Sequence, residues 1–352
     1  MELVLRFCFK TFQNLSGCEL PYEEGLQLPN EMLTKIFDYL DFQEISRCAR
    51  VSQQFNNISE LTWKSWDKIT IQDKEVPNEF LEILLEKGIK ELQILGCKML
   101  PPKVPNPKFT HPLKLKVLRI DDSCEGYAGL ITNILETHPM EKIEIEESEE
   151  FISNEKCSEF FASLPQTGSQ LRSLTLPPEF ELNRESLDCI FESCVNLEEL
   201  RLGSSASDPS LADYLSSNLT PSILKLDIYW FDNFDDNALC KLVKQCSKLQ
   251  MLDIRGTEVT WDGLSTIIDN LRDLEFLAVP SEIGEELGLE NKIDMLKMEK
   301  LRSMKELKCL LIGDPDENRK YQEILVKEMP QLIRPEFEYL HHAEIEKFLY
   351  DF

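Results

Sequence analysis

The chain has 352 residues, of which 42% are hydrophobic and 29% charged, and its formal net charge is −26. This composition indicates a folded globular protein, and no run of about 18 apolar residues predicts a membrane span. The acidic balance argues against nucleic acid as the main partner, because a phosphate backbone needs clustered cations. Two interpretations of the charge stay open, a soluble surface or attraction for a basic partner.

Cysteine usage indicates a reducing compartment. Eleven cysteines are scattered without C-x-x-C pairs, and several occupy apolar positions, among them Cys48 and Cys194. They are expected to act as small core residues, and nothing has the ligand spacing of a zinc site, so no metal is predicted. Residues 1–12 are apolar but interrupted by Arg6 and Lys10, without the cleavage site of a signal peptide. We predict an intracellular protein, cytoplasmic, nuclear or both.

The first predicted element lies in residues 28–40, LPNEMLTKIFDYL, where large apolar side chains recur at helical spacing. Pro29 suits the first turn of this helix. A second helix is predicted after Asp41, with Glu44 three residues on, and a third after Ser52. Three short helices carry more large apolar residues than we expect them to hide from one another. The apolar face is therefore predicted to pack either on the first repeat or on another protein.

Residues 67–88 predict a strand-like piece and an amphipathic helix, which would cap the array that follows. That array is the strongest signal in the sequence: the pattern apolar-x-x-apolar-x-apolar recurs at intervals of 26, 25, 31, 26, 26, 26, 25 and 33 residues. Segments with helical apolar spacing follow these strands. Since one strand–helix unit cannot bury its apolar face alone, we predict an α/β solenoid with parallel strands on the concave face and helices on the convex face. The units start at Ile89, Leu115, Met140, Leu171, Leu197, Ile223, Leu249, Leu274 and Leu307, with a degenerate unit at Leu332.

The third, fifth and seventh positions of each unit are predicted to point to the concave face. This floor is polar and charged in the N-terminal half and gains aromatic and apolar residues in the C-terminal half. Aromatic, Met and Arg residues are enriched in interfaces. Equally, the C-terminal tail EFEYLHHAEIEKFLYDF could fold back and cover the patch. The candidate substrate contacts are Tyr229, Met251, Arg255, Phe276 and Leu311.

The repeats resemble leucine-rich repeats of the cysteine-containing kind, over roughly residues 89–340. The endings CVNL (194–197) and CSKL (246–249) resemble that family's cysteine before the next strand. The stretch GTEVTWDGL (256–264) resembles its G-x-x-x-T-D-x-G-L segment. The resemblance specifies a fold and is silent about function.

The head resembles an F-box over residues 28–66: L-P, an acidic residue, a hydrophobic pair, I-F-x-Y-L-D and a second helix ending in A-x-V. After Val51 the sequence departs from the pattern, with Phe55 near the position where many F-boxes have Trp. F-boxes dock a small Skp-family adaptor, which joins them to cullin and RING subunits of a ubiquitin ligase. The resemblance thus implies adaptor contacts from Leu28, Pro29, Met32, Leu33, Ile36, Phe37, Leu40, Val51 and Trp63.

These patterns together predict the domain organisation. An N-terminal extension (1–25) precedes the F-box (26–66), a linker and cap (67–88), about nine leucine-rich repeats (89–331), and a degenerate last unit with a C-terminal tail (332–352).

Two functional hypotheses from different classes follow. With 13 glycines and no phosphate-cradling loop or nucleophile–base motif, no catalytic residue and no cofactor is predicted. The first hypothesis is a non-catalytic substrate receptor of a Skp–cullin–F-box ubiquitin ligase, which directs a target protein to proteasomal degradation. The second is an acidic leucine-rich-repeat inhibitor or scaffold outside any ligase. They differ in whether the face of Leu33, Phe37 and Leu40 is free for an adaptor.

Overall fold

The structure is a computed structural model that describes residues 29–40, 42–65, 67–100, 113–120, 127–146, 154–177, 180, 182–203, 208, 210–231 and 233–333. The chain divides into two compact units. The first comprises Met1–Ile69, Glu79–Leu92 and Phe109–Leu115, and the second comprises the remainder. Predictions about residues 1–28 and about the C-terminal tail from residue 334 therefore lie outside the described residues.

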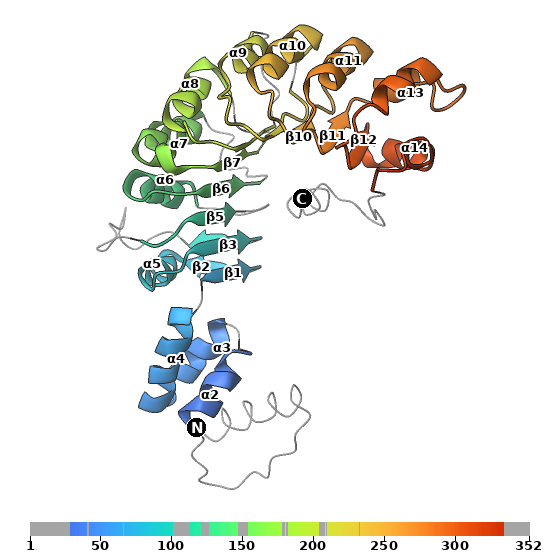
Figure 1. Cartoon of the computed structure of the whole chain (residues 1–352). Helices are drawn as coiled ribbons and strands as arrows, with labels where there is room; N and C mark the ends of the chain where they lie inside the picture. Colours follow the sequence, from blue (N-terminus) through green and yellow to red (C-terminus); the bar gives the residue numbers. More distant parts are fainter. Residues whose placement is uncertain are drawn as a thin grey trace, which may run out of the picture. The chain divides into compact units, whose positions relative to one another are not determined.

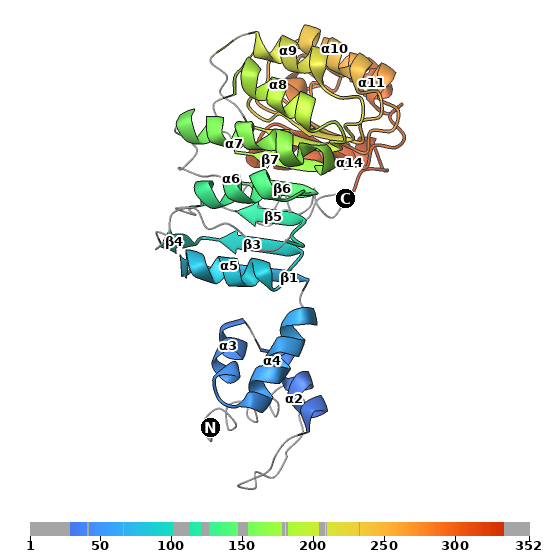
Figure 2. The ribbon, with the colours of Figure 1, turned by 90° about the vertical axis from the view of Figure 1, so that its left-hand side faces the viewer.

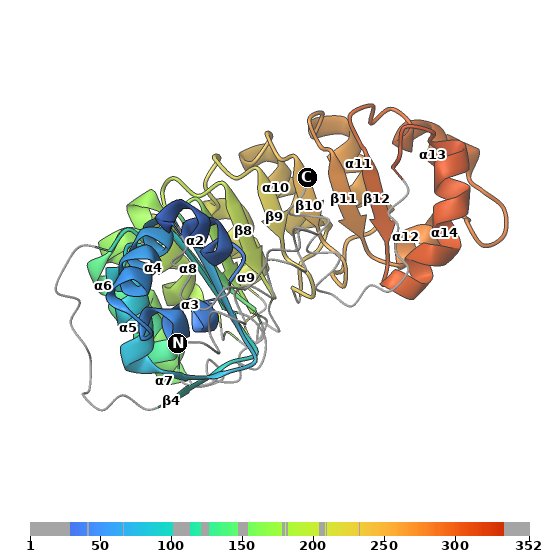
Figure 3. The ribbon, with the colours of Figure 1, turned by 90° about the horizontal axis from the view of Figure 1, so that it is seen from below.

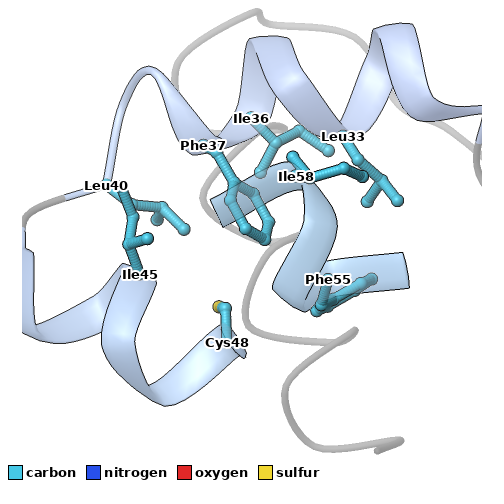
Figure 4. Close-up of a cluster of buried hydrophobic side chains, with 8 residues drawn as sticks. All are labelled: Leu33, Ile36, Phe37, Leu40, Ile45, Cys48, Phe55 and Ile58. Atoms are coloured by element: carbon cyan, nitrogen blue, oxygen red, sulfur yellow. The ribbon is translucent and has the colours of Figure 1, made fainter. Parts of the chain in front are cut away.

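Three helices form the head in the first unit (Figure 1): α2 (Asn30–Phe37), α3 (Phe42–Ala49) and α4 (Gln53–Ser65). Both α2 and α3 pack against α4, and the apolar side chains of all three meet in one cluster (Figure 4). Within the cluster the rings of Phe37 and Phe55 lie edge to face, with centroids 5.5 Å apart. The cluster consists of Leu33, Ile36, Phe37, Leu40, Ile45, Cys48, Phe55 and Ile58.

This cluster shows that the head covers the apolar stripe of its first helix with its own residues. The third helix spans 13 residues, and its Phe55 and Ile58 cover the apolar stripe of α2. Burial of a large apolar side chain contributes about 2 kcal/mol, so the head has its own core. The apolar face of the first helix thus packs against other residues of the head.

Ten strands form one sheet in which nearly every strand lies beside its neighbour in the sequence. The strands from β5 to β12 run parallel. A separate two-stranded sheet pairs β2 (Glu75–Pro77) with β4 (Lys98–Leu100). The ten strands are β1 (Lys68–Gln72), β3 (Glu91–Leu95), β5 (Val117–Ile120), β6 (Lys142–Ile145), β7 (Ser173–Leu176), β8 (Glu199–Leu202), β9 (Lys225–Asp227), β10 (Met251–Asp253), β11 (Phe276–Val279) and β12 (Cys309–Ile312).

Helices alternate with the strands and cover one side of the sheet. In the second unit, β5 to β12 follow the inner side of an arc and α6 to α11 its outer side (Figures 1 and 2), while Figure 3 shows β8 to β12 side by side along the arc. The predicted α/β solenoid after a helical head is confirmed. The helices are α5 (Asn78–Glu86), α6 (Ala128–Thr137), α7 (Asn154–Thr167), α8 (Arg184–Ser193), α9 (Leu211–Asn218), α10 (Asp236–Gln245), α11 (Trp261–Asn270), α12 (Glu282–Glu286), α13 (Met295–Leu301) and α14 (Pro315–Glu328).

One backbone joint recurs between successive units. The carbonyl of Arg172 accepts the N–H groups of Glu198 (2.8 Å) and Glu199 (2.9 Å), and the carbonyl of Glu198 accepts those of Leu224 (2.8 Å) and Lys225 (3.0 Å). Each acceptor is the second residue of the six-residue sequence pattern, so the pattern sets the register between strands. The acceptors are Lys116, Glu141, Arg172, Glu198, Leu224, Gln250 and Glu275.

The last described residues continue this joint. The N–H of Ile333 donates to the carbonyl of Lys308 at 2.7 Å, at the position where the sequence predicts the degenerate unit from Leu332. Lys308 is itself the second residue of its unit. The register of the ladder thus extends one hydrogen bond beyond β12.

Single residues mark where the helices on the outer side of the arc begin and end. Side chains of Asn183, Asp235 and Thr260 accept N–H groups in the first turns of α8, α10 and α11. Cys194 and Cys246 end α8 and α10 and are buried. Burial raises the pKa of both thiols to about 12, so they serve as small core residues and not as nucleophiles at neutral pH.

Two helical glycines give a stability test of this packing. A Cβ at Gly263 in α11 would lie 2.2 Å from Oδ1 of Asp236 and 2.7 Å from Cγ1 of Val259, whereas a Cβ at Gly129 in α6 would meet nothing within 4 Å. We expect Gly263→Ala to lower the free energy of unfolding by about 1–3 kcal/mol. Gly129→Ala should leave it unchanged or raise it by up to about 1 kcal/mol. Urea denaturation measures both, and equal effects would contradict the packing of α11.

Candidate interaction surfaces of the head and the solenoid

Four predicted adaptor contacts lie inside the head. The side chains of Leu33, Ile36, Phe37 and Leu40 are between 0 and 4% exposed. They contact one another and residues of α3 and α4. They therefore belong to the core of the head and not to its surface. The apolar stripe of α2 is buried among residues of the head.

Other predicted contacts remain accessible. Pro29 is exposed, and Met32 and Val51 are half-buried against the edge of the core. Leu28 lies outside the described residues, and Trp63 lies in α4 with a side chain that is also outside them.

Two apolar side chains on the head were missed in the sequence. Tyr39, just after α2, is 62% exposed, and Leu61, in α4, is 59% exposed. Both lie off the helical stripe formed by the buried positions, and that offset was the available signal. A hydrogen bond of 2.9 Å from Nε2 of Gln54 to Oδ1 of Asn30 ties α4 to the start of α2, beside Pro29.

Ion pairs neutralise much of the concave floor of the solenoid. Fifth-position residues pair across neighbouring strands, as Arg201 does with Asp227 at 2.8 Å, and third-position residues do the same, as Lys225 does with Glu199 at 2.9 Å. Glu144 is fully buried between Arg119 and Lys142. Burial alone would raise the pKa of Glu144, but the two cations outweigh it and hold that pKa below its usual value.

A tighter network lies at the ends of β9 and β10. The guanidinium of Arg255 donates from Nε to Oδ1 of Asp253 at 3.0 Å and from Nη2 to Oδ2 at 2.6 Å. Asp227 accepts the N–H of Tyr229 at 3.0 Å, and Asp253 accepts the N–H of Arg255 at 3.1 Å, so successive units repeat one turn. Burial, reinforced by Asp253 and opposed by Arg201, raises the pKa of Asp227 to about 6.

The predicted apolar patch of the floor is a packed cluster. Phe276 and Leu311 are 1% and 2% exposed, and Arg255 is also buried, so these three offer little surface to a substrate. Strand register explains the cluster, because Met251 pairs with Phe276, and Phe276 with Cys309. The competing interpretation, cover by the tail, concerns residues outside those described. Of the five predicted contacts, Tyr229 and Met251 are half-buried.

An exposed tryptophan follows β9 beside this network. Trp230 is 53% exposed and was not singled out in the sequence. Its ring meets the ring of Tyr229 edge to face, with centroids 5.8 Å apart, and the guanidinium of Arg255 lies 5.0 Å from the centroid of Tyr229. The hydroxyl of Tyr229 reaches Oδ1 of Asp314 at 3.4 Å. These side chains bring together the loop after β9, the end of β10 and the residue before α14.

Two searches of the described residues concern membranes and metals. None of the helices in this part of the chain is long and apolar enough to cross a membrane. The same residues contain no group of three or more His, Cys, Asp or Glu side chains placed to hold a metal ion.

Comparison with known proteins identifies the head. Residues 26–72 match the family model of F-box-like domains. The chain therefore carries an F-box-like domain, as the sequence predicts, and a solenoid of strand–helix units follows it. No curated protein matches the chain in sequence.

Two solved structures are similar in part. Internalin C2 from Listeria monocytogenes is 14% identical, with a TM-score of 0.39 over 67% of this chain and 90% of its own. A chain of the yeast Rad7 and Elc1 complex is 11% identical, with a TM-score of 0.42 over 89% of both chains. The fold assignment rests on the repeats and strand register of this chain itself.

The raised pKa of Asp227 predicts a pH dependence. The folded state holds a proton on Asp227 up to about pH 6, above the usual value of 3.8. The carboxyl therefore makes unfolding progressively easier as pH rises from about 4 to above 6. Replacing it by Asp227→Asn removes this contribution, so the stability of the variant relative to wild type should increase over that range. Urea unfolding at several pH values measures the difference, and parallel curves would contradict the assignment.

Asp235→Asn is the control of opposite sign. Hydrogen bonds from the N–H groups of Ala238 and Asn237 hold the pKa of Asp235 below 3.8, and the bond from Ala238 has the larger effect. Its ionised form stabilises the folded state above that value, and the contribution is lost as pH falls below it. The wild-type advantage over Asp235→Asn should therefore shrink in acid.

The contact between Trp230 and Gly256 can be tested by a double-mutant cycle. Gly256 has φ +69°, and a Cβ there would lie 2.9 Å from Cδ2 of Trp230. Gly256→Ala should cost about 1–2 kcal/mol or more in the wild type. In a Trp230→Gly background the new Cβ no longer meets the indole ring. We therefore expect Gly256→Ala to lower the free energy of unfolding by about 1 kcal/mol less than it does in the wild type. Additive effects in urea denaturation would show that the ring does not rest on Gly256.

Proposed function

We propose that the chain is a non-catalytic substrate receptor of a Skp–cullin–F-box ubiquitin ligase. In this proposal the F-box-like domain docks a Skp-family adaptor, and through it cullin and RING subunits. The solenoid binds a target protein for ubiquitination and proteasomal degradation. The observation that carries the proposal is the match of residues 26–72 to F-box-like domains, joined to a solenoid in one chain.

The form of the head supports adaptor binding. A core closed by its own residues makes the head a preformed module, and binding then costs less ordering of the chain. Accessible apolar residues nevertheless remain on it, namely Pro29, Met32, Tyr39, Val51 and Leu61. Exposed apolar residues around a folded core are what a partner can bury. The adaptor surface is accordingly assigned to these residues and not to Leu33 or Phe37.

The second hypothesis, an acidic leucine-rich-repeat scaffold or inhibitor, gains from one observation. The face of Leu33, Phe37 and Leu40 is buried, which is the outcome expected of a scaffold. This burial does not favour a scaffold, because residues of the head itself cover these side chains. A head that only capped the solenoid would use this face to cover the repeats, so we favour the receptor.

The proposal is tested with the full-length chain and a purified Skp-family adaptor, with affinity measured by calorimetry. The variant Pro29→Ala/Met32→Ala removes accessible contacts and leaves the buried cluster intact. We expect its dissociation constant to rise about tenfold or more. Circular dichroism should show that the variant keeps its helices.

The matched control is Leu296→Ala, since Leu296 is an exposed apolar residue, 80% accessible, in the solenoid. It should bind the adaptor as tightly as the wild type. Absence of adaptor binding by the folded wild-type chain would reject the receptor function and leave the scaffold.

A further inference from the structure

The backbone of Trp230 adopts a conformation that bulky residues rarely take. Among the described residues, three non-glycine residues have positive φ: Asp73, Asn233 and Trp230, the last at +57°. Asp and Asn enter this left-handed region readily, because their short side chains bond locally, but a tryptophan there is an outlier. Strained residues of this kind cluster at functional sites, which makes Trp230 a candidate contact.

Three contacts hold this conformation in place. The N–H of Trp230 donates to the carbonyl of Arg255 at 2.9 Å. Beneath the ring lies Gly256, where any Cβ would approach Cδ2 to 2.9 Å. The edge-to-face contact with Tyr229 supports one side. The ring is thus fixed while 53% of the residue stays exposed to solvent.

The neighbouring aromatic ring already binds a cation. The guanidinium of Arg255 lies 5.0 Å from the centroid of Tyr229 and is neutralised by Asp253. Cations are attracted to aromatic faces, most strongly to that of tryptophan. Trp261 also carries a cation, since Nζ of Lys297 lies 5.0 Å from its ring. No cation of the described residues is placed over Trp230 in this way.

Two acidic residues belong to the loops that neighbour the exposed ring. The N–H of Glu258, two residues after Gly256, donates to the carbonyl of Phe234 at 3.0 Å, so Glu258 belongs to the same group of loops. Its side chain is exposed, and none of the ion pairs between described residues includes it. Asp314 lies at the hydroxyl of Tyr229. Together with the net charge of −26, these carboxylates favour a cationic ligand over a neutral or anionic one.

We propose that Trp230 is the contact point for an arginine or lysine side chain in a basic segment of the target protein. The cation lies over the exposed indole and is also attracted by Glu258. The inference rests on the proposed receptor function, because the partner it names is the target. It moves recognition from the predicted floor residues Phe276 and Leu311 to the loops at the ends of β9 and β10.

The test uses the full-length chain labelled with 5-fluorotryptophan, whose four tryptophans report separately by fluorine NMR. The probe is the peptide acetyl-Gly-Arg-Gly-Arg-Gly-amide, and its control carries citrulline in place of arginine. We expect the Trp230 signal to shift saturably with the arginine peptide and about two- to five-fold more weakly with the citrulline peptide. The ring of Trp261 already has the cation of Lys297 over it, so the Trp261 signal should shift little.

Two variants sharpen the test. Trp230→Phe assigns the signal, and Glu258→Gln should weaken the response to the arginine peptide but not to the citrulline peptide. A stationary Trp230 signal, or equal shifts with both peptides, would overturn the inference, and both shifts are measured on the wild-type chain. Adaptor affinity is measured on the same chain. Loss of the peptide response with intact adaptor binding would reject only this contact, and the reverse result would reject only the receptor function.

Discussion

The solenoid depends on one repeated backbone constraint, a carbonyl that accepts two N–H groups from the following unit. Because the carbonyl belongs to the second residue of each six-residue pattern, all units enter the sheet in the same register. The fourth and sixth positions then stack as a continuous core, as Leu200, Leu226 and Leu252 do. The fifth positions stack as a row on the opposite face, which is how Arg201 comes to lie beside Asp227.

That register explains what could be predicted from the sequence and what could not. The spacing of the leucines was enough to predict the strands, their parallel order and the helices that follow them. Alternation also named the side chains that leave the core, but not whether their neighbours close over them, and so Phe276 was assigned to the surface although it is buried. In the head, the stripe of Leu33 and Phe37 showed that something covers it. The third helix was predicted as well, but the sequence did not show that its Phe55 and Ile58 would cover this stripe.

The exposed sites were harder to predict for a related reason. Tyr39 and Leu61 lie off the helical stripes, but that offset does not by itself show whether a neighbour covers them. Trp230 depends on a left-handed backbone and on the missing side chain of Gly256 in the next unit. The contact with Gly256 joins residues that are 26 positions apart in the sequence. The charged floor positions were named from the sequence, but the cross-strand pairs that neutralise them follow from the register between strands.

The recurring carbonyl joint has a consequence for how such a chain can change in length. Residues 223–248 form one unit whose two ends carry equivalent joints, at Glu198 and at Leu224. A duplicate of this segment, inserted directly after it, would meet the same acceptor and the same apolar neighbours as the original. Whole copies of this unit could therefore be inserted without breaking the backbone hydrogen bonds between successive strands. Each added copy would add one strand and one helix to the array, and so enlarge the surface that the solenoid offers without altering the residues at its two ends.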